Sequence, residues 1–192
     1  MLVAYASRHG GTAEIAETIA DKLREYDLTV VCLPVASVTG LSSYDAVVLG
    51  SAVYFNHWRP DAARFLRQHG HELSQRPFWA FSSGPVGEAQ PGPQWHEPHR
   101  IMAEVRQLHA RGHVVFGGRV STIQDGPVEC LMVQRLPPAS RDRRDWGDVR
   151  TWASQIASQL DARRRRSPET PAARRHGARQ PDRSPGFRER RP

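Results

Sequence analysis

Five short, largely apolar runs alternate with stretches of helical periodicity along this chain. Continuous apolar runs suit strands that are buried on both faces of a parallel sheet. Between the runs, apolar residues recur at helical spacing, as in the stripe from Ile15 to Leu23. Strands that alternate with helices predict a doubly wound α/β domain with helices on both faces of the sheet. The predicted strands are residues 2–6, 29–35, 46–50, 78–81 and 113–120, and the predicted helices begin near Ala13, Pro60, Ile101 and Val149.

The order of the predicted strands follows from their connections. Right-handed crossovers on both faces place the first strand inside the sheet, and 2-1-3-4-5 is the usual order for five strands. In that order a ligand binds beyond the carboxyl ends of strands one and three. We therefore look for functional residues in the loops that follow the first, third and fourth strands.

The chain has 192 residues, which is enough for one α/β domain and a tail. We place the domain at residues 1–162 and the tail at residues 163–192. The tail holds 11 arginines against three acidic residues, a net +8, so residues 1–162 carry about −1 of the total +7. Its Arg, Pro, Ser and Gly content predicts disorder. Such a tail attracts any polyanion without specificity, so we expect peripheral contact with anionic membrane and no specific nucleic acid partner.

Several classes of protein are disfavoured by the sequence. No apolar run reaches the roughly 18 residues of a membrane span, and Met1 leads directly into a strand, so no signal peptide is expected. Cys32 and Cys130 lie in apolar stretches and are expected to be reduced thiols in a cytoplasmic protein. The paired histidines at positions 69 and 71, and 96 and 99, lack a third ligand, so we predict no metal site.

The loop after the first strand is the best candidate for a binding site. Small and polar residues at the start of a helix offer backbone N–H groups and hydroxyls to an anion, and glycines allow a ligand close to the backbone. The loop lacks the lysine of a P-loop and the spacing of a dinucleotide-binding motif. It therefore suits a phosphate monoester, and the alternative is an ordinary strand-to-helix turn. The predicted ligands are Ser7, Arg8, His9, Gly10, Gly11 and Thr12.

Two further loops should meet the first one at the same edge of the sheet. The loop after the third strand is aromatic, and the loop after the fourth is rich in glycine. A flat, amphipathic ring needs apolar cover on its faces and backbone groups at its polar edge. Tyr54, Phe55 and Trp58 either contact the ligand or pack in the core at the start of the next helix. The predicted ligand-binding residues are Ala52, Val53, Tyr54, Phe55 and Asn56 in one loop, and Ser83, Gly84, Pro85, Val86 and Gly87 in the other.

Together these motifs resemble the flavodoxin superfamily. Within it, the chain is most similar to the short, menaquinone-dependent protoporphyrinogen IX dehydrogenases. The resemblance covers about residues 1–160 and leaves out the tail. It rests on residues 5–12, on Gly50-Ser51-Ala52-Val53, on Phe116-Gly117-Gly118-Arg119, on Arg144-Asp145-Trp146, and on Val149, Trp152, Ala153, Ile156 and Ala157.

The resemblance implies a flavodoxin-like fold, noncovalent FMN, and electron transfer from a porphyrinogen to a membrane quinone. It identifies no catalytic residue. The alternative is a flavodoxin-type electron carrier without a substrate of its own. Carriers tend to be strongly acidic around the flavin, and residues 1–162 are nearly neutral, which favours an enzyme. A long connection, residues 121–143, either helps to dock the substrate or quinone or caps the sheet edge, through Leu131, Met132, Val133 and Leu136.

Overall fold

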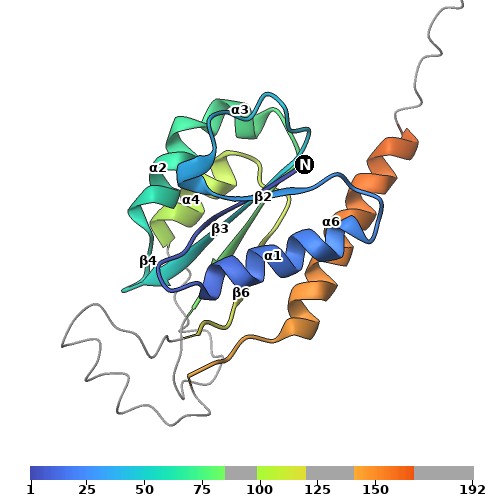
Figure 1. Ribbon diagram of the computed structural model, residues 1–192. Coiled ribbons are helices and arrows are strands. Elements are labelled where there is room, and N and C mark those ends of the chain that lie inside the picture. The colour runs from blue at the N-terminus through green and yellow to red at the C-terminus, as the bar shows by residue number, and fades with distance from the viewer. Residues whose placement is uncertain (85–98, 120–140, 167–192) are drawn as a thin grey trace, which may run out of the picture.

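The computed structural model describes residues 1–84, 99–119 and 141–166. Its centre is a parallel sheet in the order β2-β1-β3-β5-β6, which confirms the predicted order of the five strands (Figure 1). A two-residue strand, β4, pairs antiparallel with the end of β3. The strands are β1 Leu2–Ala6, β2 Val31–Pro34, β3 Val47–Tyr54, β4 His57–Trp58, β5 Phe78–Ser83 and β6 His113–Phe116.

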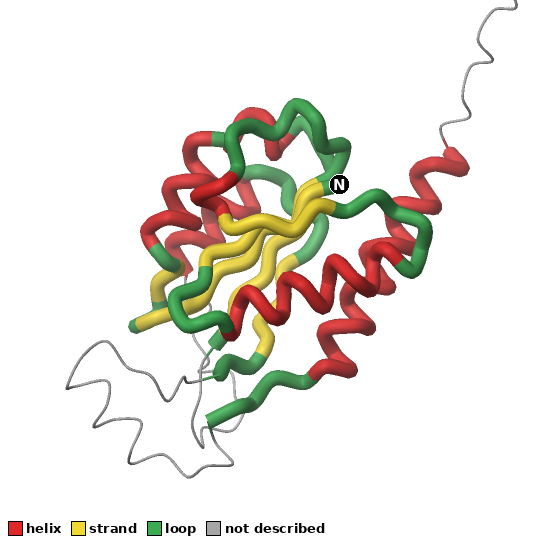
Figure 2. The backbone as a smooth tube through the Cα atoms, viewed as in Figure 1, coloured by secondary structure: helices red, strands yellow, loops and turns green. Residues whose placement is uncertain are grey.

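Helices cover both faces of the sheet (Figure 2). On one face lie α1 Gly11–Arg24 and α6 Trp146–Arg166. On the other lie α2 Pro60–Gln68, α3 Gly70–Ser74 and α4 His99–Gln107, together with the short 3-10 helix Val35–Ser37. No helix among residues 1–84, 99–119 and 141–166 is long and apolar enough to cross a membrane.

The core has two layers because successive strand residues face opposite sides of the sheet. In β5, Phe78 contributes to the layer under α2 and α4, whereas Phe81 contributes to the layer under α1 and α6. Phe81 packs edge-on against Trp152 of α6, with ring centroids 6.2 Å apart. Its ring occupies the space that a side chain at Gly50 would need, which explains a glycine inside the central strand.

Element ends differ from the sequence-based expectations. β3 and β5 run to Tyr54 and Ser83, further than predicted, because each continues to pair with its neighbours at the sheet edge. β2 and β6 are shorter than predicted, and α3 was not predicted. α6 continues to Arg166, so the first four residues of the predicted tail are helical. The rest of the tail, and the four apolar residues between 131 and 136, lie outside the described residues.

Cys32 is the cysteine that the structure describes. It is half-buried in β2 and forms no disulfide within the described residues. Burial raises the pKa of its thiol to about 11. The Cys32 side chain is therefore a neutral thiol near pH 7.

Candidate functional site

The ends of three central strands meet at one edge of the sheet. Ala6 at the end of β1 pairs with Ser51 of β3, and Ala52 of β3 pairs with Ser83 of β5. Gly84 continues from β5 in an extended left-handed conformation (φ 129°), where a Cβ would lie only 3.3 Å from the Val53 carbonyl oxygen. Glycine therefore allows the loop after β5 to pass close to β3, and the three predicted loops begin side by side.

The first loop leads directly into α1. Gly10 occupies the N-cap position with φ 83°, which favours glycine, and among the described residues no side chain caps the helix. The first backbone N–H groups of an α-helix have no partner inside the helix, so this end of α1 can donate to an anion.

Thr12 is the most informative residue of this loop. It lies in the first turn of α1 and is only 2% exposed. Within the part of the chain that the structure describes, its hydroxyl makes no hydrogen bond. A buried polar group without a partner costs about 1–3 kcal/mol. A ligand oxygen at the helix end would remove that cost, so the residues fit a phosphate better than an ordinary turn.

The predicted site residues differ in exposure. In the first loop, Gly11 and Thr12 are buried, Arg8 is exposed, and Ser7, His9 and Gly10 are intermediate. At the other two strand ends, Ala52, Ser83 and Gly84 are buried, Val53 is intermediate, and Tyr54, Phe55 and Asn56 are exposed. Three predicted residues, Pro85, Val86 and Gly87, lie outside the described ranges. The structure thus brings the starts of all three loops to one edge.

The segment after β3 is a tight hairpin and not the open loop that was predicted. Val53 pairs with Trp58 and Tyr54 with His57, which leaves Phe55 and Asn56 as a two-residue turn. Both turn residues have positive φ, 47° and 65°. Such hairpin turns favour Asn or Gly, so Phe55 is strained. Its side chain is 89% exposed at the tip.

The base of the hairpin is anchored in the core. Trp58 is 4% exposed, and its indole N–H donates to the Ser82 hydroxyl at 2.9 Å. Ser82 Oγ lies 3.0 Å from Nε2 of His113. The backbone N–H of Arg59 donates to the buried Ser51 hydroxyl. Trp58 is therefore a core residue, which decides between the two interpretations of this tryptophan.

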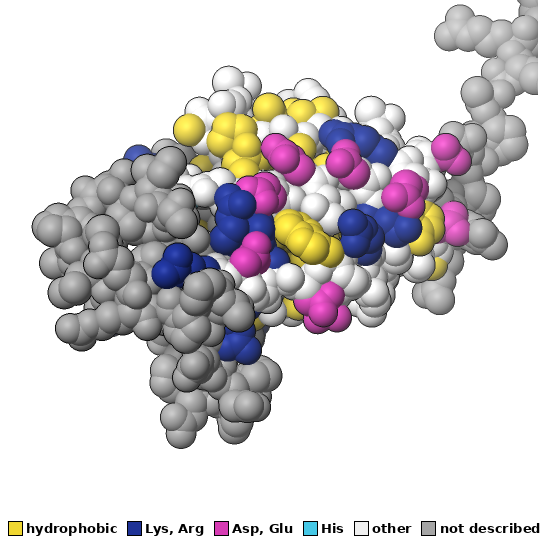
Figure 3. Space-filling model, turned by 60° about the horizontal axis from the view of Figure 1, so that its bottom comes forward, with side chains coloured by type: hydrophobic (Ala, Val, Ile, Leu, Met, Phe, Trp, Pro, Cys, Tyr) yellow, Lys and Arg dark blue, Asp and Glu magenta, His cyan; other side chains and the backbone are white. Residues whose placement is uncertain are grey.

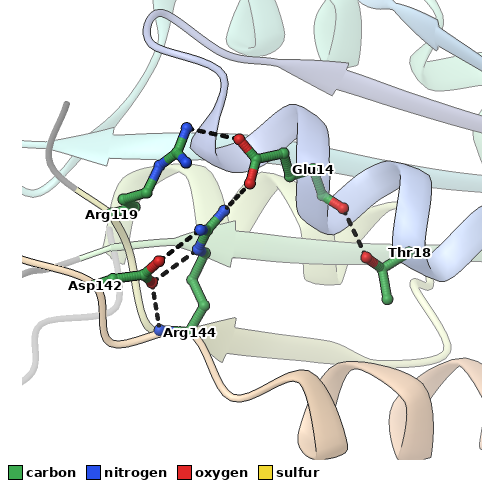
Figure 4. Close-up of polar contacts among 5 residues, drawn as sticks. All are labelled: Glu14, Thr18, Arg119, Asp142 and Arg144. Atoms are coloured by element: carbon green, nitrogen blue, oxygen red, sulfur yellow. Dashed lines mark hydrogen bonds and ion pairs between the residues drawn. The ribbon is translucent and has the colours of Figure 1, made fainter. Parts of the chain in front are cut away.

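A charged cluster beside the first loop was missed by the sequence analysis (Figure 4). Glu14 of α1 binds two arginines, with Oε1 2.6 Å from Arg119 and Oε2 2.7 Å from Arg144. Arg144 also binds both carboxylate oxygens of Asp142. Its side chain is 4% exposed and stacks on Trp146, with the guanidinium carbon 4.6 Å from the ring centroid.

The hydrogen bonds from Arg144 hold the pKa of the Asp142 carboxyl below its ordinary value. Backbone pairing supports the cluster. Arg119 and Asp142 form an isolated antiparallel β-bridge, and the N–H of Arg143 donates to the Gly118 carbonyl. A side chain at Gly117 would collide with Arg143. The motifs around Arg119 and Arg144 were noticed in the sequence, but nothing there showed that they meet.

A family model described as a flavodoxin domain matches residues 2–144 of the chain. The chain belongs to the flavodoxin family. Among curated proteins, it is similar to the probable flavodoxin 1 of Bacillus subtilis (strain 168), with 40% identity over 52 residues. These residues are 26% of this chain and 33% of the relative, so the match spans about a third of the relative's length.

Solved structures support the flavodoxin-like fold. A flavodoxin from the domain Archaea matches with a TM-score of 0.55 and 15% identity, covering 83% of this chain and 97% of that one. The rubredoxin oxygen:oxidoreductase of Desulfovibrio gigas matches with a TM-score of 0.56 and 19% identity, covering 84% of this chain and 36% of that one. At these identities the likeness shows the fold alone.

In this flavodoxin-family chain the strand ends combine donors for an anion with exposed aromatic side chains. The end of α1 supplies N–H donors and the Thr12 hydroxyl, while the hairpin supplies exposed aromatic side chains. A hollow of about 350 Å³ lies along α1, against the start of α6. Its lining includes Glu14, Glu17, Asp21 and Arg150, so it is a charged surface groove that reaches the cluster around Glu14.

Proposed function

We propose that the chain binds FMN at the carboxyl edge of the sheet and works as a redox protein. The buried Thr12 hydroxyl, which has no partner within the described residues, carries the proposal. It lies at an uncapped helix N-terminus beside a glycine with positive φ, where the backbone can approach a phosphate. Membership of the flavodoxin family supports the same ligand.

Each part of the edge has a role in this proposal. Ser7, Thr12 and the first N–H groups of α1 bind the phosphate. Tyr54 and Phe55 would cover the flavin ring, and the backbone of Ser83 and Gly84 would face its polar edge. Bound FMN would supply the chemistry, because its ring takes up and releases electrons. The protein's residues bind and orient the ring and limit the access of water to it.

We further propose that the chain is an oxidoreductase that passes electrons from a reduced substrate to a quinone, with a porphyrinogen as the candidate substrate. Two observations support an enzyme with an apolar partner. Phe55 and Tyr54 are 89% and 37% exposed at the rim of the site, and exposed apolar side chains there suit an aromatic substrate or quinone. Residues 1–162 carry a net charge of about −1, unlike the strongly acidic surroundings of the flavin in a typical carrier, and acidic and basic side chains are intermixed on the face that Figure 3 shows.

The alternative is an electron carrier of the flavodoxin type, which docks to redox proteins and has no substrate of its own. Similarity to proteins named flavodoxins favours it. Under either proposal the arginine-rich tail would bring the protein to anionic membrane surfaces, where each basic side chain near the surface contributes about 1 kcal/mol.

Two measurements test the proposal in sequence. Titration of the apoprotein with FMN should quench flavin fluorescence and give a dissociation constant in the micromolar range or below. A protein that leaves the fluorescence unchanged does not bind FMN here. The reduced holoprotein is then mixed anaerobically with menaquinone analogues, and the oxidised one with a porphyrinogen. Turnover with both supports the enzyme, and a holoprotein that exchanges electrons with redox proteins alone supports the carrier.

A further inference from the structure

We propose that Arg119 recognises the phosphate of the flavin, so that this site selects a phosphorylated flavin over an unphosphorylated one. The inference rests on the proposed binding of FMN and adds to Arg8 of the first loop a second arginine, which comes from a distant part of the chain. Arg119 lies more than 100 residues from that loop in the sequence, just before the segment 120–140.

The guanidinium of Arg119 lies against the glycines of the first loop. A Cβ at Gly10 would lie 3.7 Å from Nη2 of Arg119, and a Cβ at Gly11 would lie 3.6 Å from its Cβ. Figure 4 shows the side chain beside the turn that leads into α1. The positive charge is therefore next to the helix end in whose first turn the buried Thr12 lies. All three features favour the same kind of group, an anion with several oxygens.

Two contacts hold Arg119 in this position. Its backbone forms a β-bridge with Asp142, and its Nη2 lies 2.6 Å from Oε1 of Glu14. Glu14 in turn is held at its other oxygen by the buried side chain of Arg144. The guanidinium of Arg119 is thus oriented before any ligand binds, so less side-chain conformational entropy is lost on binding.

Arg119 keeps binding capacity after this contact. A guanidinium carries five N–H donors, and Glu14 engages one of its nitrogens. The side chain is 34% exposed, so a ligand can reach it. Glu14 and Asp142 together balance the charges of Arg119 and Arg144, so the ligand would bind through the remaining N–H donors of Arg119. A dianionic phosphate therefore gains an attractive partner here, whereas the hydroxyl of riboflavin gains little.

The test compares FMN with riboflavin, which lacks the phosphate, in fluorescence titrations of the apoprotein. Arg119→Gln should weaken FMN binding about tenfold or more and change riboflavin binding less than twofold. Arg119→Lys should restore part of the preference, because lysine keeps the charge without the fork of donors. FMN binding by the wild type should weaken more steeply with added salt than binding by Arg119→Gln.

Arg67→Gln is the matched control. Arg67 also binds a glutamate, Glu104, with Nη2 2.8 Å from its carboxylate, but this pair joins α2 to α4 on the other face of the sheet. Its removal should leave both flavin affinities unchanged.

The possible failures are distinguishable. Equal losses of affinity for FMN and riboflavin in Arg119→Gln would show a structural role and overturn the inference. Unchanged FMN affinity in that variant would also overturn it. Wild-type protein that binds neither flavin would overturn the proposed function together with the inference.

Discussion

The two loops on either side of the proposed flavin site are held in different ways. The first loop depends on distant residues, since Arg119 packs on its glycines and Glu14 behind it binds arginines 105 and 130 positions away. The β3–β4 hairpin depends on neighbours in sequence, with a two-residue turn and an anchored Trp58. One loop buries an unsatisfied hydroxyl and the other exposes a strained phenylalanine.

This difference indicates that the two loops have different roles in ligand binding. A loop fixed by tertiary contacts can hold polar donors in place for a charged group. A tip that exposes an aromatic side chain can gain by covering an apolar ring, and it tolerates a range of ring positions. We therefore expect specificity from the first loop and general affinity from the hairpin.

Removal of both hydroxyls from the first loop should have the largest effect. Each hydrogen bond to a charged phosphate contributes about 1.5–3 kcal/mol, so Ser7→Ala with Thr12→Val should weaken FMN binding by two or more orders of magnitude. Fluorescence titration measures the change, and thermal unfolding checks that the fold persists. Thr18→Val is the control, because Thr18 donates to the Glu14 carbonyl within α1. Unchanged FMN affinity in the double variant would place the phosphate elsewhere.

Arg144→Met should show that the first loop depends on distant contacts. It removes the buried guanidinium that binds Glu14 and Asp142, whose carboxylates are 40% and 46% exposed and can be rehydrated. We expect a loss of about 2 kcal/mol in the free energy of unfolding. FMN binding should weaken more than riboflavin binding, because the phosphate end is affected. If the affinities for FMN and riboflavin fell equally, the first loop and the hairpin would not be independent.

Phe55→Gly should make the protein more stable and a poorer binder. Glycine adopts φ 47° without the cost of about 1–2 kcal/mol that other residues incur, so urea denaturation should show a gain of about 1 kcal/mol. Loss of the aromatic side chain should weaken the binding of FMN and of riboflavin alike, by up to about tenfold. Phe55→Ala is the control, since it removes the ring and keeps the strain. A glycine variant no more stable than the alanine variant would argue against strain at the tip.

The smallest effect should come from Asp142 and depend on pH. Its folded pKa lies below the unfolded value of about 3.9. The stabilisation is therefore fully present above the unfolded pKa and is lost as pH falls through the folded pKa. Asp142→Asn should cost less than about 1 kcal/mol at pH 7, because the carboxylate is 46% exposed. In urea denaturation from pH 7 to pH 3, the difference in free energy of unfolding between the variant and the wild type should shrink. A difference that stays constant would contradict the ion pair.

The sequence by itself determined the fold class and the strand order, and it predicted the edge of the sheet where the candidate site lies. Strand and helix periodicities are local, and right-handed crossovers leave few ways to connect them, so the ends of β1, β3 and β5 could be placed together. The same patterns identified Ser7–Thr12 as the first loop. The hairpin was missed because Phe55 at a positive φ contradicts local preference, and pairing of β4 with β3 overrides it.

The tertiary structure decided which side chains meet. Trp58 was ambiguous in sequence, and the structure buries it in the core, where its indole N–H donates to the Ser82 hydroxyl of β5. The contacts of Glu14 with Arg119 and Arg144 depend on two crossovers and on the pairing of residues 117–119 with 141–144. No local pattern encodes a contact across 130 residues. Periodicity specifies which face of an element is buried, whereas the packing of whole helices on the sheet determines which charged side chains lie opposite one another.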